Sequence, residues 1–307
     1  MPVNPARPLS PHLQVYKPQL TSILSIMHRA TGVGLALGLP VLVAWLVVLA
    51  ANQRIFETFN DLFQNPIGHV LLFGWSWAFF FHACTGIRHL FWDAGYFLGI
   101  KNIYRTGWLA IGLSTLITGY VWFDIENGDW MVAGIILMQF LGAMIVLACV
   151  LGVLLWLNGL IPRAEKKNTS MRGPLAKARG LGAAKEGTAH WWALRVTSAA
   201  LVLLSIYVVA SFFVQRVYSD YVVASIWLTS PFAAVLMILF VGVGFHHAAN
   251  GLQVVIEDYV RCEKLKLASI VAIKFIATAL ALLAAIAVLK ILLFTIIAGL
   301  IKNAAGQ

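Results

Sequence analysis

The stretch that decides the fold is residues 79–93, FFFHACTGIRHLFWD. It ends a long apolar run and places His82 deep inside that run, Gly86 one helical turn later and Asp93 at the exit. A related pattern, HAANGLQVVIED, occupies residues 247–258. In both copies the histidine precedes the glycine by four residues and the aspartate by eleven. The repeated spacing indicates that two helices carry equivalent functional groups.

The two histidines, His82 and His247, are predicted to lie at the same depth if their helices run in the same direction. At about 1.5 Å per residue, each imidazole lies roughly 16 Å from the exit aspartate. Facing imidazoles at one depth can ligate one haem iron axially, and a glycine one turn along leaves room for a flat macrocycle. The alternative is a histidine satisfied by its neighbours in the helix bundle. Ionisable residues inside membranes are functional by default, and the repeat favours a ligand pair.

The composition is that of a polytopic helical membrane protein. Of the 307 residues, 61% are hydrophobic and only 11% are charged, and the mean hydropathy is +0.85, which excludes an ordinary soluble domain. The net charge of +10 is interpreted as membrane topology and lipid contact, with no nucleic-acid partner. The three scattered cysteines predict neither a disulfide framework nor a zinc site, and the chain has no flavin motif or ferredoxin-like cysteine run. Prolines interrupt the N-terminus, so no signal peptide is predicted.

Seven membrane spans are predicted from the apolar runs. A short polar loop carrying Arg54, Glu57 and Asp61 is expected between the first two spans. The third span is barely long enough to cross a bilayer. The predicted spans cover residues 22–51, 67–91, 107–123, 131–160, 191–214, 232–256 and 267–300.

The lysines and arginines predict the orientation of these spans. With the N-terminus in the cytoplasm, most of the 22 basic residues fall at the cytoplasmic side. The exceptions are Arg54, Arg216 and Lys302 outside, and Lys274 and Lys290 within the last span. The positive-inside bias therefore predicts a cytoplasmic N-terminus and a periplasmic C-terminus. It also makes the second and sixth spans parallel, as the equal-depth argument requires.

The fold class is predicted to be all-α, with two three-helix units joined by an extra crossing helix. The first unit covers residues 1–125, the joining helix and linker 126–170, and the second unit 171–307. The first unit ends outside and the second begins inside, so the fourth span has to return the chain across the bilayer. Met171 begins the second unit as a free-standing chain would begin, which indicates a fusion of two subunits.

Several segments resemble a known family. The first unit, in the motifs RPLSPHL, SILSIMHRATG and the stretch from His82 to Asp93, resembles the cytochrome b subunit of succinate dehydrogenase. The second unit resembles the smaller membrane anchor of the same enzyme. Its matching segments are RGLGAAKEGT at 179–188, HWW at 190–192, Arg195 and residues 247–259. The fourth span lies outside the resemblance.

The resemblance implies two three-helix anchors around one haem b, with ubiquinone bound near the cytoplasmic surface. It also implies docking of a flavoprotein subunit and an iron–sulfur subunit on that face, and contact with membrane lipids elsewhere. Matched residue by residue, the metal ligands are His82 and His247. The quinone-site positions are Ser25, Arg29 and Tyr259, with Asp258 beside them. The positions near the haem propionates are His28, His89 and Arg195. Arg88 is also predicted near the propionates, because it is a cation at the cytoplasmic end of its span.

The residues themselves leave simpler interpretations open. Ser25, His28 and Arg29 share one helix face, because they lie three and four positions apart. Arg29 could simply extend to the membrane surface, and Ser25 could bond its own helix. Tyr259 could belong to an aromatic belt, or its phenol could donate to a quinone with Asp258 relaying a proton. Arg88 and His89 could be interfacial anchors.

One neighbouring histidine competes with His247 for the ligand position. His246 lies next to it, but neighbouring residues point about 100° apart on a helix, so only one can face a haem. The spacing to Gly251 and Asp258 selects His247.

The sequence therefore predicts the haem- and ubiquinone-binding membrane anchor of a succinate:ubiquinone oxidoreductase, complex II of the tricarboxylic acid cycle. The chain would act only as a subunit, in the inner membrane of a bacterium. Three alternatives remain: the anchor of a quinol:fumarate reductase, a membrane transporter built from two repeats, and a purely structural anchor without haem.

Overall fold

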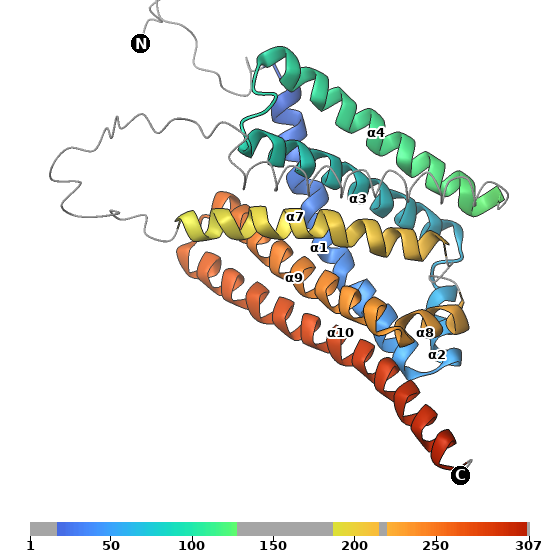
Figure 1. Ribbon diagram of the computed structural model, residues 1–307. Coiled ribbons are helices and arrows are strands. Elements are labelled where there is room, and N and C mark those ends of the chain that lie inside the picture. The colour runs from blue at the N-terminus through green and yellow to red at the C-terminus, as the bar shows by residue number, and fades with distance from the viewer. Residues whose placement is uncertain (1–16, 128–186, 215–219, 306–307) are drawn as a thin grey trace, which may run out of the picture.

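The computed structural model describes residues 17–127, 187–214 and 220–305. Within these ranges the chain is helical and has no strand. In order, the helices are α1 (Leu20–Ala51), α2 (Gln53–Asp61), α3 (Pro66–Asp93), α4 (Ile100–Asn127), α7 (Gly187–Val214), α8 (Tyr221–Thr229), α9 (Pro231–Tyr259) and α10 (Glu263–Ala305). Figure 1 shows the long helices running roughly side by side, with α1 crossing the others obliquely.

Six of these helices are long and apolar enough to cross a membrane: α1, α3, α4, α7, α9 and α10. The prediction of an all-α polytopic membrane protein is therefore confirmed. The predicted fourth span, residues 131–160, lies outside the described residues, so the count of seven spans is not tested. The third span is longer than predicted, because α4 already begins at Ile100.

The described helices repeat one order twice: a long helix, a short helix and two further long helices. The short helices, α2 and α8, lie at the same end of the bundle (Figure 1) and contact one another. Asn52 caps α2 by accepting a hydrogen bond from the Ile55 N–H, and Asp220 caps α8 by accepting from two backbone N–H groups. The next long helix of each unit begins with a proline, Pro66 or Pro231, whose missing N–H costs nothing at that position.

The prediction of a polar loop between the first two spans is wrong, because residues 53–61 form α2. Only one side of this short helix faces the protein, so its polar residues resemble a loop in sequence. Phe56 is completely buried there. Its ring lies 5.8 Å from the ring of Trp45 in α1 and 5.6 Å from that of Tyr221 in α8. These contacts link the first unit to the second at this end of the bundle.

The main hydrophobic core surrounds α9, which packs against α10, α7 and α1. Small side chains such as Ala233 and Ala234 are buried on α9 and allow neighbouring helices to approach closely. The interface between α1 and α3 also depends on small residues. A Cβ atom on Gly38 would overlap the Trp75 indole, so glycine is required for this approach.

Helices α3 and α9 run in the same direction. Their last residues, Asp93 and Tyr259, lie at the end of the bundle where α1 and α7 begin, and α10 extends beyond the opposite end (Figure 1). The ion pairs described below join the first turns of α1 and α7 to the ends of α9 and α3. The geometry needed for two histidines at one depth is therefore present.

Candidate functional site

His82 of α3 and His247 of α9 face each other across the boundary between the two units. Their ring centroids lie 6.4 Å apart, and the ring planes are inclined by 78°. No other pair of histidines from different units is in ring contact among the described residues. The neighbouring His246 turns elsewhere, since its Nε2 lies 3.0 Å from the Asn250 amide nitrogen one turn along the same helix.

Hydrogen bonds fix how both rings present their nitrogens. The Nδ1 of His82 lies 3.1 Å from the carbonyl oxygen of His28, which can only accept, so this nitrogen carries the proton. The Nδ1 of His247 lies 3.0 Å from the hydroxyl of Thr197. That hydroxyl already donates to the Ala193 carbonyl at 2.6 Å, so it accepts from His247. In both rings Nε2 is left with its lone pair, as a metal ligand needs.

The separation of His82 and His247 fits two axial ligands of one metal ion. Metal–nitrogen bonds of about 2 Å, plus about 1.1 Å from each nitrogen to its ring centre, place such centroids about 6 Å apart. The observed separation is 6.4 Å. Two histidines supply only two ligands, which suits a metal that brings its remaining ligands with it, as haem iron does.

The glycines near the two facing histidines differ in how much space surrounds them. A Cβ on Gly251 would meet nothing within 4 Å, and one on Gly86 would touch only the His28 ring at 3.9 Å. Protein atoms therefore leave space beside both glycines, one turn from each facing histidine. Gly32 of α1 is tight instead, because a Cβ there would lie 2.9 Å from Cε1 of His82.

Two more histidines extend the cluster toward the ends of α3 and α9. The His28 ring stacks on the His82 ring, with centroids 3.9 Å apart and planes inclined by 8°. Its Nδ1 lies 2.7 Å from the hydroxyl of Thr85, which donates to the Phe81 carbonyl and so accepts from His28. The His89 ring lies 5.2 Å from that of His28. His28, His82 and His89 therefore form one continuous group between α1 and α3.

Arg29 joins the first unit to the second. Its Nη1 donates to Oδ2 of Asp258 at 2.6 Å, and the two side chains are 38% and 45% exposed. Ser25 lies one turn before Arg29 and is exposed, and the phenol-bearing Tyr259 directly follows Asp258 and is also exposed. The four predicted quinone-site residues thus gather around one ion pair at the surface.

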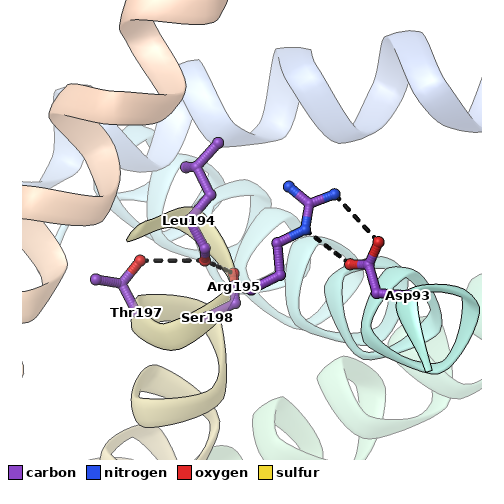
Figure 2. A network of polar contacts seen from close by, with 5 residues as sticks. All are labelled: Asp93, Leu194, Arg195, Thr197 and Ser198. Carbon is purple, nitrogen blue, oxygen red and sulfur yellow. Dashed lines mark hydrogen bonds and ion pairs between the residues drawn. The ribbon is translucent and has the colours of Figure 1, made fainter. Parts of the chain in front are cut away.

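Arg195 makes a second ion pair between the units, shown in Figure 2. Its Nε and Nη2 donate to the two carboxylate oxygens of Asp93 at 2.8 and 3.2 Å. This two-point geometry is the stronger form of an arginine–carboxylate pair. The Nη1 of Arg195 is not used in it, so the guanidinium retains donors for another anion.

Arg88 is directed toward α4. It is buried, with only 7% exposure. Its Nε donates to the Thr106 hydroxyl at 3.1 Å and its Nη2 to the Ile103 carbonyl at 2.9 Å, while the guanidinium lies over the Trp92 ring. These contacts connect α3 to α4 and do not support the predicted contact of Arg88 with a haem propionate, which stays a prediction.

Sequence analysis did not identify the residues that orient the site. Thr31 and Thr197 each lie two positions after an arginine, in the pattern R-x-T, on the first helix of each unit. Thr31 is 3.4 Å from the Nδ1 of His82, and Thr197 is 3.0 Å from that of His247. The repeated R-x-T pattern was present in the sequence and could have indicated both threonines. Asp93 was used only to measure spacing.

Comparison with known proteins places this arrangement in a family. The model of the succinate dehydrogenase/fumarate reductase transmembrane subunit matches residues 3–121 and again residues 169–281, which together exceed half of the chain. The chain belongs to this family. It matches the family twice, in the two segments that sequence analysis assigned to separate units, as expected of a fused anchor. Membership also overturns the alternative of a two-repeat transporter.

Relatives named as cytochrome b subunits match a little over a third of the chain. The succinate dehydrogenase cytochrome b556 subunit of Rickettsia conorii is 43% identical over 116 residues, which are 38% of this chain and 90% of that protein. The corresponding subunit of Paracoccus denitrificans is 38% identical over 121 residues, covering 38% of this chain and 93% of that subunit. No solved structure matches significantly. The family and these relatives identify a membrane anchor of the succinate dehydrogenase complex.

Proposed function

We propose that this chain binds haem b and ubiquinone as the membrane anchor of a succinate:ubiquinone oxidoreductase, and passes electrons from a partner iron–sulfur subunit to ubiquinone. The observation that carries the proposal is the facing pair His82 and His247, with both Nδ1 atoms engaged and a centroid separation of 6.4 Å. The chain acts only within the complex, because electrons reach it from a partner.

In this proposal His82 and His247 would hold the haem iron. The haem supplies a one-electron carrier inside the membrane. The His28 carbonyl and the Thr197 hydroxyl keep the two rings neutral and oriented, as partners of metal-bound histidines generally do. The open space beside Gly86 and Gly251 accommodates the macrocycle.

The propionates of the haem are proposed to point toward the ends of α3 and α9. His28, His89 and Arg195 lie on that side of the facing histidines, and the Nη1 of Arg195 is not used in its pair with Asp93. Three buried polar atoms without a hydrogen-bond partner in the described residues also belong to this end of the bundle: Trp92 Nε1, His190 Nε2 and Gln253 Oε1. Buried polar groups are rarely left unpaired, so the unpaired atoms support a polar ligand here.

Ubiquinone is proposed to bind beside the Arg29–Asp258 pair. The Arg29 guanidinium polarises a quinone carbonyl, the Tyr259 phenol and Ser25 hydroxyl donate hydrogen bonds, and Asp258 holds Arg29 and relays protons. Reduction to the quinol consumes two electrons and two protons, and this position near the surface gives protons access. Because these side chains are exposed, the docked iron–sulfur subunit is needed to close the site.

The remaining predictions on organisation follow from the same orientation. The flavoprotein and iron–sulfur subunits dock at the end that holds Arg29 and Arg195, which is the cytoplasmic face of a bacterial inner membrane. The two units keep the proposed boundaries 1–125 and 171–307, with residues 126–170 joining them. Exposed apolar side chains on the long helices contact lipid.

A reduced-minus-oxidised optical spectrum of the purified full chain tests the proposal. We expect the bands of a six-coordinate low-spin b haem, and we expect His82→Ala or His247→Ala to abolish them. His246→Ala is the matched control, since it removes the neighbouring imidazole and leaves the bands in place. Absence of a low-spin haem from the wild-type chain would refute the haem assignment. Loss of the bands in His246→Ala alone would show that the wrong histidine had been assigned.

The anchor of a quinol:fumarate reductase remains the alternative within the family. The same residues of this chain would serve either reaction, so only a measurement of enzyme activity distinguishes the two directions. The assembled complex is assayed for succinate-driven ubiquinone reduction and for quinol-driven fumarate reduction, and we expect the first to be faster.

A further inference from the structure

The two ion pairs between the units are exchanged in a regular way. In one pair, Arg29 of α1 in the first unit contacts Asp258 of α9 in the second unit. In the other pair, Arg195 of α7 in the second unit contacts Asp93 of α3 in the first unit. Each aspartate lies eleven residues after one of the facing histidines. Each arginine lies two residues before a threonine, and that threonine contacts one of the facing histidines. The pairs are therefore equivalent by an approximate two-fold relation.

The surroundings of these equivalent pairs are different. One turn before Arg29 stands Ser25, whereas one turn before Arg195 stands Trp191, whose ring lies 4.6 Å from the Arg195 guanidinium carbon. The residue after Asp258 is Tyr259, whereas the residue after Asp93 is alanine. The hydroxyl groups that could bind a quinone at the first pair are thus absent from the second, and an indole stacks on its cation.

The second pair is also the more closed of the two. It is bidentate, and its side chains are only 30% and 25% exposed, against 38% and 45% at the Arg29–Asp258 pair, which makes a single contact. Partial burial reduces screening by solvent, so this pair has more effect on stability than an exposed one.

The Arg195–Asp93 pair connects the elements that position the two facing histidines. Asp93 ends α3, the rigid helix that carries His82. Arg195 lies two residues before Thr197 on α7, and Thr197 accepts the hydrogen bond of His247 (Figure 2 shows the pair and Thr197). One contact therefore ties the helix of the first histidine to the residue that orients the second.

We propose that Arg195 and Asp93 form a clamp that holds the two units in register and thereby keeps His82 and His247 at one depth. They are positioning residues. Their pair is the less exposed equivalent of the Arg29–Asp258 pair at the proposed quinone site. The clamp is a property of the chain itself. Its consequence for haem retention rests on the proposed function.

A charge exchange in the full chain tests the clamp. We expect Asp93→Asn and Arg195→Gln each to speed haem dissociation to an apo-globin acceptor about tenfold, which corresponds to about 1.4 kcal/mol. The double exchange Asp93→Arg with Arg195→Asp should return the thermal unfolding temperature of the full chain in detergent to near that of the wild type, whereas each single variant lowers it. The exchange suits the C-terminal end of α3, where a cation at position 93 interacts favourably with the helix dipole.

Glu263→Gln is the matched control. It breaks the Glu263–Lys266 ion pair, which lies at the same end of the bundle but within one helix, and should leave the dissociation rate unchanged. If Arg195→Gln speeds dissociation while Asp93→Asn does not, Arg195 acts on the haem alone and the clamp is refuted. Failure of the double exchange to restore the unfolding temperature also refutes it.

The thermal unfolding temperature separates failure of the clamp from failure of the haem proposal. If the wild-type chain holds no haem, the proposed function fails, and the same variants are compared by the unfolding temperature of the full chain in detergent. A loss in both single variants that the exchange restores supports the clamp. Equal loss in the singles and in the exchange refutes it.

Discussion

Substitution of Gly32 by alanine tests whether the observed position of His82 is the working one. A Cβ at position 32 would lie 2.9 Å from Cε1 and 3.4 Å from Nδ1 of the His82 ring. Ordinary carbon contacts are about 3.5–4.0 Å, so the ring or the helix has to move by roughly 0.6–1 Å. The ring cannot simply tilt away, because His28 stacks on it with centroids 3.9 Å apart.

The expected effect of Gly32→Ala follows from that displacement. Overpacking of this size typically costs about 1–3 kcal/mol. Ligand geometries generally have to be held within about 0.5 Å, so the shift exceeds the tolerance of an axial ligand. We expect haem to bind about tenfold more weakly, with partial loss of the six-coordinate low-spin bands.

Haem content per chain, the optical spectrum and the rate of haem transfer to apo-globin measure this effect. Gly34→Ala is a matched control two residues along the same helix, because a Cβ there would meet nothing within 4 Å. It should leave all three quantities close to those of the wild type. A wild-type spectrum and transfer rate in Gly32→Ala, or equal losses in both variants, would show that His82 does not bind iron from this position.

Three further predictions address orientation, the quinone site and topology. Thr197→Val keeps the side-chain shape but removes the acceptor of His247, and should weaken haem binding about tenfold to a hundredfold; Thr278→Val, which loses a similar hydroxyl on α10, should not. Arg29→Ala and Tyr259→Phe should slow ubiquinone reduction by the assembled complex, the first about a hundredfold, while succinate-dependent dye reduction by the soluble subunits continues; a parallel loss of both activities would indicate an assembly defect. A reporter fused to the C-terminus should be active in the periplasm and one within residues 161–190 in the cytoplasm, and a cytoplasmic C-terminus would contradict the proposed crossing.

The sequence predicted the features of the fold that depend on a regular period. Apolar runs located the described membrane spans, because every backbone polar group inside a bilayer has to be satisfied within a helix. The spacing of eleven residues predicted that His82 and His247 lie level, because helix rise is nearly constant. It did not predict α2, since a nine-residue helix with one buried aromatic residue, Phe56, contributes little to an apolar run.

The partners of the site residues were harder to predict than their positions. A sequence gives the depth of a residue along its helix, but the rotation of the helices about their axes depends on packing. Arg88 illustrates this limit, because its position at the cytoplasmic end of its span suggested a propionate contact, whereas packing directs it to Thr106 and the Ile103 carbonyl of α4. Asp93 illustrates the converse, since only the structure shows that it pairs with Arg195.

The exchanged contacts explain how a duplicated arrangement can serve a single reaction. Each unit supplies one histidine, one arginine and one aspartate, and each of these faces the other unit. Neither unit alone can pair its charged groups in this way, so the arrangement favours association of the two. The proposed haem would use the symmetric part, where the contributions of both units are alike. The asymmetry arises from the residues beside the arginines and aspartates: Ser25 and Tyr259 provide hydroxyl groups at one pair, whereas Trp191 covers the other. The same repeated arrangement can therefore bind a ligand at the Arg29–Asp258 pair and hold the two units in register at the Arg195–Asp93 pair.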